Sequence, residues 1–107
     1  MAREKVNQFK ENASRYPEQM VKKLEALRVA AKLTQEELAD YVGFSRARYA
    51  HVIAGTAKLS WKNYLAFLFF FEHNERTTEM LHQLELYPGE YIKQINTPTR
   101  KELRQNE

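Results

Sequence analysis

The residues with the clearest chemical capability lie between Ser45 and Gly55. If this stretch is a helix, Tyr49 and Val52 turn inward. Its outer face then carries two arginines, one histidine, three alanines and no acid: Arg46, Ala47, Arg48, Ala50, His51 and Ala54. Guanidinium groups donate paired hydrogen bonds to phosphate and to base edges, and alanine permits close approach. An ordinary solvated helix mixes Glu with Lys, so this face favours contact with an anionic partner. A solvated basic face is the alternative interpretation.

Other kinds of chemistry find little support. The chain has no cysteine, which excludes disulfides, cysteine nucleophiles and cysteine-based zinc sites. His73 and His82 lie nine residues apart, on opposite faces if they share one helix, and we expect no carboxylate–histidine geometry to join them. We therefore expect no metal site and no cofactor. No nucleophile, acid–base pair or phosphate loop is visible, so we expect no enzymatic activity.

The composition is that of one globular domain with an uneven distribution of charge. The chain has 107 residues, 43% of them hydrophobic, and only three glycines and three prolines, which favours helices. The net charge is +4 over 1–32, zero over 33–60, −3 over 61–92 and +2 over 93–107. This polarity is expected of a small protein that lays one side on nucleic acid, although a mixed solvated surface also produces it.

Nothing in the sequence indicates a membrane or a secretory route. The longest apolar run has eight residues, which is well below the ~20 that span a bilayer. The first 16 residues lack the apolar core of a secretory signal. We therefore expect a cytoplasmic protein without membrane contact.

Apolar spacing and start signals predict a series of helices. Amphipathic helices are predicted over 4–15 and 17–32, from apolar residues three and four apart: Val6, Phe9, Ala13 and Tyr16, then Met20, Leu24, Leu27 and Ala31. Thr34 and Glu37 form a capping box, which predicts a helix that begins there and ends at Gly43.

The next two helices begin with serine. Ser45 predicts a helix that ends at Gly55, and the three-residue turn before it contains Gly43, which is the sequence form of a helix-turn-helix. Ser60 caps a helix over 61–72 that is apolar nearly all round. Such a helix is buried on several sides or meets a partner chain. Both alternatives stay open for its phenylalanines: Phe67, Phe69, Phe70 and Phe71.

The C-terminal part has weaker patterns. A helix is predicted over about 77–86, a turn at Pro88 and Gly89, and either a short strand or a helical turn over 90–95. Residues 99–107 are expected to form a mobile polar tail. The chain thus divides into an N-terminal extension that we expect to be helical (1–16), a central domain (17–87) and a C-terminal extension (88–107).

One segment resembles a known family. The stretch from Leu33 to Ser60 is similar to the helix-turn-helix of the phage Cro and CI repressors, whose bacterial relatives are also called XRE-like. The similarity rests on residues at the expected spacing: Leu33, Thr34, Gln35, Glu36, Leu38, Ala39, Gly43, Ser45 and Gly55. With its flanking helices it covers about 20–70. It implies an all-α, lambda-repressor-like bundle of about five helices. The predicted N-terminal helix and the stretch 75–107 lie outside the resemblance, so the expected fold adds an extra N-terminal helix and a short C-terminal extension to that bundle.

The resemblance also implies roles by position. Arg46, Ala47 and His51 match positions that read bases in the major groove, where arginine pairs with guanine and alanine contacts the thymine methyl. Positions that contact the DNA backbone are matched by Gln35, Ser45, Arg48 and Lys58. Gln35 is also expected to brace the recognition helix.

Two departures from the family pattern concern the contacts between helices. Ile53 stands where many members have a glutamate that pairs with a basic residue of the first helix, here Arg28. Arg28 therefore needs another partner, either a DNA phosphate or a different carboxylate. Tyr49 occupies a core position that is usually β-branched, so its hydroxyl must reach solvent or a partner.

The expected function is sequence-specific binding of double-stranded DNA by a homodimeric transcriptional regulator of the repressor type. Two alternatives stay open. An antitoxin or accessory subunit would bind a partner protein through the aromatic helix 61–72 or the C-terminal extension. A protein-interaction module would have kept the fold and lost DNA binding.

Overall fold

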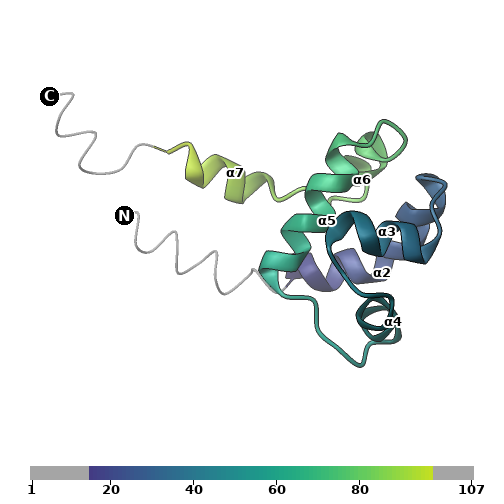
Figure 1. The fold of residues 1–107 in the computed structure, drawn as a ribbon. Coiled ribbons are helices and arrows are strands. Elements are labelled where there is room, and N and C mark those ends of the chain that lie inside the picture. The colour runs from purple at the N-terminus through teal and green to yellow at the C-terminus, as the bar shows by residue number, and fades with distance from the viewer. Residues whose placement is uncertain (1–14, 98–107) are drawn as a thin grey trace, which may run out of the picture.

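The structure, a computed structural model, describes residues 15–97 and consists of helices in that range (Figure 1). The helices are α2 (Arg15–Ala30), α3 (Gln35–Val42), α4 (Arg46–Ala54), α5 (Trp61–His73), α6 (Thr78–Gln83) and α7 (Gly89–Ile95). The all-α prediction is confirmed, and five helices, α2–α6, form the bundle. The helix predicted over 4–15 and the tail predicted over 99–107 lie outside the described residues, apart from Arg15. The division at residues 16 and 87 stays a prediction.

Helix α2 begins and ends two residues earlier than the apolar spacing predicted. Pro17 lies in the first turn, where its missing N–H has no partner to lose. The helix ends in a Schellman motif, in which Lys32 N–H donates to Val29 O (3.0 Å) and Leu33 N–H donates to Arg28 O (3.3 Å). Lys32 adopts the left-handed conformation that this motif requires, with φ of 60°.

Replacing Lys32 with glycine is expected to stabilise the protein. A left-handed φ costs a side-chain-bearing residue about 1–2 kcal/mol, and glycine avoids this cost but loses more chain entropy on folding. We expect the free energy of unfolding to rise by about 1 kcal/mol, measured by urea denaturation. Lys23→Gly, in the middle of α2, removes the same charge and should lower it by about 1 kcal/mol. A destabilised Lys32→Gly variant would contradict this explanation.

The predicted caps of α3, α4 and α5 are confirmed. Glu37 N–H donates to Thr34 Oγ1 (3.1 Å), and Thr34 N–H donates to Glu37 Oε1 (2.9 Å), which completes the capping box. Ser45 and Ser60 accept from backbone amides of α4 and α5 in the same way. The two C-terminal glycines take left-handed φ values, 78° for Gly43 and 80° for Gly55. These local signals therefore define the turn between α3 and α4.

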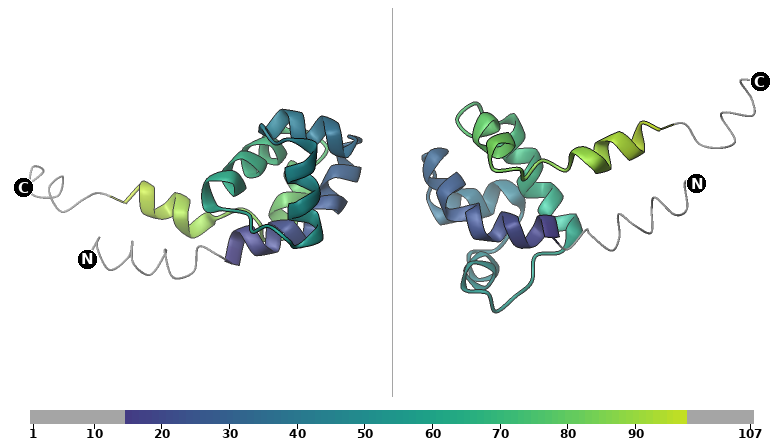
Figure 2. Two further views of the ribbon diagram at one scale, coloured as in Figure 1. Left: turned by 60° about the horizontal axis from the view of Figure 1, so that its bottom comes forward. Right: turned by 180° about the vertical axis from the view of Figure 1, so that it is seen from behind.

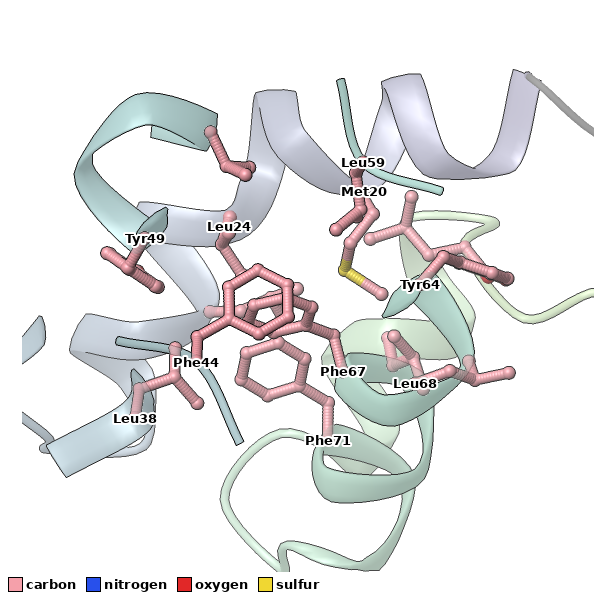
Figure 3. Close-up of a cluster of buried hydrophobic side chains, with 14 of the residues drawn as sticks. Met20, Leu24, Leu38, Phe44, Tyr49, Leu59, Tyr64, Phe67, Leu68 and Phe71 are labelled. Carbon is pink, nitrogen blue, oxygen red and sulfur yellow. The ribbon is translucent and has the colours of Figure 1, made fainter. Parts of the chain in front are cut away.

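The core lies where α2, α3, α4 and α5 converge around Phe67 (Figure 3). The Phe67 ring centroid lies 5.3 Å from that of Phe44, 6.3 Å from that of Tyr49 and 6.4 Å from that of Phe71. Met20 and Leu24 of α2 and Leu38 of α3 pack around these rings (Figure 3). Helix α5 thus connects the helix-turn-helix to the rest of the bundle.

The aromatic run of α5 divides between core and surface. Phe67 and Phe71 are fully buried, whereas Phe69 is 68% exposed. Phe70 is partly buried, and its ring centroid lies 5.2 Å from that of the exposed Tyr41. The fully buried residues of α5 share one face at helical spacing and Phe70 is only partly buried, so the predicted burial on several sides is met in part. A dimer contact through its exposed face stays a prediction.

The C-terminal segment differs in detail from the prediction. Helix α6 covers only Thr78–Gln83, which is shorter than the predicted 77–86. Of the two alternatives predicted for residues 90–95, the structure shows the helical one. A turn was predicted at Pro88 and Gly89, but Gly89 is the first residue of α7, so the prediction is wrong for Gly89. Helix α7 extends away from the bundle and has no buried residue (Figure 2).

Candidate nucleic-acid interface

Helix α4 exposes the face that the sequence predicted. It lies at the opposite end of the bundle from α6 (Figure 1). Tyr49 and Val52 are its buried residues. The predicted outward residues are all exposed: Arg46, Ala47, Arg48, Ala50, His51 and Ala54. The inward–outward division of α4 is therefore confirmed, and its acid-free face is open to a ligand.

A shallow recess beside α4 brings three of the predicted site residues together. Gln35 at the start of α3, Arg46 at the start of α4 and Arg28 from α2 line it, next to Thr34 and Glu36. Residues expected to contact phosphate thus share one surface with a residue expected to contact a base. Lys58 lies elsewhere, in a second recess.

That second recess lies between the start of α2 and the loop that follows α4. Lys58 lines it together with Lys22 and Glu18, beside the apolar Val21 and Leu59. Two lysines there extend the positive charge beyond α4, and Glu18 offsets part of it. Lys58 therefore lies apart from the predicted site residues at the start of α4.

Arg48 and Ser45 are partly engaged within the protein. The Arg48 guanidinium carbon lies 4.5 Å from the centroid of the Phe44 ring, which is a cation–π contact. The Arg48 amide donates to Ser45 Oγ (3.1 Å), so the serine oxygen serves as the cap of α4. The Arg48 guanidinium is thereby held near the start of α4 while it stays exposed.

The imidazole of His51 is held by the loop that follows α4. His51 Nδ1 lies 2.9 Å from Thr56 Oγ1, and the Thr56 hydroxyl also lies 3.2 Å from the His51 carbonyl oxygen. This contact uses Nδ1 and leaves Nε2 facing away from Thr56. The ring therefore offers one nitrogen to a ligand, as donor or acceptor according to its tautomer.

A carboxylate that the sequence analysis did not select connects the three helices of this region. Glu25 of α2 accepts from Tyr49 Oη (2.7 Å), from Gln35 Nε2 (2.6 Å) and from Arg28 Nε (2.9 Å). Arg28 also donates through Nη1 to Leu33 O (2.6 Å). Of the two partners considered for Arg28, the structure shows the carboxylate. The spacing of Glu25 and Arg28, three apart on one helix, is the signal that could have indicated this pair.

The pKa of Glu25 reflects this network. Burial by itself raises the pKa, but the hydrogen bonds from Arg28, Tyr49 and Gln35 outweigh it and hold the pKa below its usual range. Burial, together with the hydrogen bond to the same carboxylate, raises the pKa of Tyr49, so the hydroxyl stays a donor. Glu25 is therefore charged and Tyr49 is neutral at physiological pH.

Stability should depend on pH through Glu25. Because its folded-state pKa is depressed, its contribution is present above the unfolded-state pKa and disappears as pH falls through the folded-state pKa. The Glu25 side chain is 38% exposed, so the contribution is at most about 1 kcal/mol. Thermal unfolding of Glu25→Gln should show a deficit in Tm at pH 7 that shrinks towards pH 3. An equal deficit at both pH values would contradict this role.

One histidine pairs with a carboxylate, contrary to expectation. His82 Nε2 lies 2.7 Å from Glu72 Oε2, and the His82 ring stacks on Tyr87 with centroids 4.5 Å apart. Glu72 is on α5 and His82 on α6, so the pair links two helices whose packing the sequence patterns did not predict.

Within residues 15–97, no three or more His, Cys, Asp or Glu side chains are grouped to hold a metal ion. None of the helices in that range is long and apolar enough to cross a membrane.

The fold and the exposed face together define a class of domain. A short helix with an acid-free outer face follows a second helix across a glycine turn, within a helical bundle, and this is a helix-turn-helix domain. Residues 24–63 match the family model described as Helix-turn-helix, which represents the Cro/CI type of this domain. The resemblance seen in the sequence is confirmed, and the family is one of DNA-binding domains. No curated protein and no solved structure matches the chain.

Proposed function

We propose that this protein binds double-stranded DNA sequence-specifically and regulates transcription as a repressor, with α4 in the major groove. The observation that carries the proposal is the outer face of α4, which is exposed, basic and free of acid. Nine residues form this helix, which matches a recognition helix that enters a groove by its first two turns. The proposal assigns the protein to the cytoplasm and gives it no catalytic role.

The proposed base contacts come from the exposed side chains of α4. Arg46 donates two hydrogen bonds to a guanine, Ala47 contacts a thymine methyl, and His51 uses Nε2 on a base edge. These three residues lie on one face of α4, so they meet successive base pairs.

The proposed phosphate contacts flank this face. They come from Gln35, Ser45, Arg48, Lys58 and Arg28. The bonds of Arg28 to Glu25 and Leu33 use three of the five N–H donors of a guanidinium, and two stay available for a phosphate. These contacts would supply much of the affinity without reading sequence.

We further propose that the protein binds as a homodimer, with two copies of α4 in half-sites one helical turn apart. Apolar side chains on the surface support this. Phe69 and Tyr41 are each 68% exposed, and Tyr41 lies against Phe70. A repeated contact between two copies would cover such rings and would make the recognised sequence palindromic.

The test is selection of bound duplexes from a random library with the purified chain, at low and at moderate salt. We expect enrichment of a palindromic consensus, and an affinity for it that falls steeply as salt rises, because each neutralised phosphate releases counterions. Absence of enrichment at both salt concentrations would overturn the proposal. A consensus without a palindrome would retain DNA binding and overturn the homodimer.

A further inference from the structure

Helix α4 is attached to the bundle by few side chains. Of its nine residues, only Tyr49 and Val52 are buried, and Ile53 is partly buried. Apolar packing is non-directional, because its free energy depends on the area removed from water. The apolar contact made by α4 itself therefore rests on two fully buried side chains, and a directional contact adds to what fixes its rotation about its own axis.

The Tyr49 hydroxyl supplies a directional contact. Tyr49 is fully buried, and its hydroxyl donates to Glu25 Oε2 across 2.7 Å. A hydrogen bond of this length is sensitive to angle as well as to distance. Within the described part of the chain, every buried side-chain nitrogen and oxygen has a hydrogen-bond partner. For the Tyr49 hydroxyl, this partner is the Glu25 carboxylate.

The acceptor is itself held from two sides. Arg28 of α2 donates to Glu25 through Nε (2.9 Å), and Gln35 at the start of α3 donates through Nε2 (2.6 Å). The carboxylate therefore has a defined position relative to both α2 and α3. Through Tyr49, the same carboxylate defines the position of α4.

We propose that Tyr49 and Glu25 are positioning residues, whose hydrogen bond sets the orientation of α4 relative to α2 and α3. A change in this orientation moves Arg46 and His51 together, because both are on the outer face of α4. Recognition sites tolerate errors of only about 10–20° before contacts are lost. The consequence for DNA specificity rests on the proposed function, whereas the consequence for α4 does not.

The first experiment uses the free protein and the variant Tyr49→Phe, which removes only the hydroxyl. Tyr64→Phe is the matched control, since Tyr64 is equally buried and its hydroxyl donates to Leu86 O, away from α4. Residual dipolar couplings of backbone amides report the orientation of α4 relative to α2 and α3. We expect a changed orientation in Tyr49→Phe and an unchanged one in Tyr64→Phe. The wild-type orientation in Tyr49→Phe would overturn the proposal.

The second experiment measures the ratio of affinities for the duplex selected by the wild-type chain and for a shuffled duplex of equal length. We expect this ratio to fall about tenfold in Tyr49→Phe, the equivalent of one good base contact. Binding to the shuffled duplex should not change, because phosphate contacts carry it. An unchanged ratio, or an equal fall in Tyr64→Phe, would overturn the role in specificity.

The two experiments separate this inference from the proposed function. If the wild-type chain selected no duplex, the proposed function would fail, and the dipolar couplings would still decide whether Tyr49 orients α4. If selection succeeded and the couplings of Tyr49→Phe matched wild type, the function would stand and this inference would fail.

Discussion

Replacing Phe67 with alanine is expected to lower the free energy of unfolding by about 3–5 kcal/mol. Phe67 is fully buried, and its ring lies among those of Phe44, Tyr49 and Phe71 at centroid distances of 5.3–6.4 Å. The variant loses the burial of an aromatic ring and leaves a cavity where α3, α4 and α5 meet. The free energy of unfolding of a small domain is about 5–15 kcal/mol in total, so a large part of the stability depends on Phe67.

The matched control for Phe67→Ala is on the same helix. Phe69→Ala makes the identical chemical change at a side chain that is 68% exposed. It should alter the free energy of unfolding by no more than about 0.5 kcal/mol. Urea denaturation at low protein concentration checks both variants. Equal losses in the two variants under these conditions, which favour the monomer, would contradict the exposed position of Phe69 in the single chain.

Replacing Arg46 with alanine is expected to reduce affinity for the selected duplex by about 1–3 kcal/mol and to relax one base preference. Arg46 is exposed at the first position of α4, beside the recess that Gln35 and Arg28 line. A guanidinium at this position can donate to both acceptors of a guanine in the major groove. Selection from a random library with the variant, together with binding titrations, measures both effects.

A comparison of two lost charges tests the specific role of Arg46. Lys93→Ala removes one positive charge on α7, far along the chain from α4, and should leave the consensus unchanged. If Arg46→Ala weakened binding to every sequence equally and kept the full consensus, then Arg46 would touch only phosphate. Its assignment as a base reader would then be wrong.

The network around Glu25 explains how this chain can lack the glutamate that many family members carry on the recognition helix. The glutamate that many members carry on the recognition helix is replaced by Ile53, which is partly buried. A carboxylate is still present, but it comes from α2, and Tyr49 contributes the contact from α4. The link between the two helices is thus retained with its donor and acceptor exchanged.

Much of the fold depends on interactions between residues close in the sequence, and the sequence alone was enough to predict these. The caps at Thr34, Ser45 and Ser60 join residues three apart, and the left-handed turns at Gly43 and Gly55 require only their own backbone. The apolar period of α4 likewise identified which of its residues turn inward. The helix-turn-helix and its exposed basic face could therefore be predicted without knowledge of the tertiary structure.

The partners of polar side chains were decided by the tertiary structure. Tyr49 and Glu25 are 24 residues apart, and Glu72 and His82 are ten apart on different helices. Local patterns do not encode these distances, because they depend on how whole helices pack. The sequence by itself determined where α3, α4 and α5 begin, where α3 and α4 end, and which face of α4 meets solvent. Only packing decided that Glu25 would join α2, α3 and α4, since a hydrogen bond forms only where two helices bring donor and acceptor within about 3 Å.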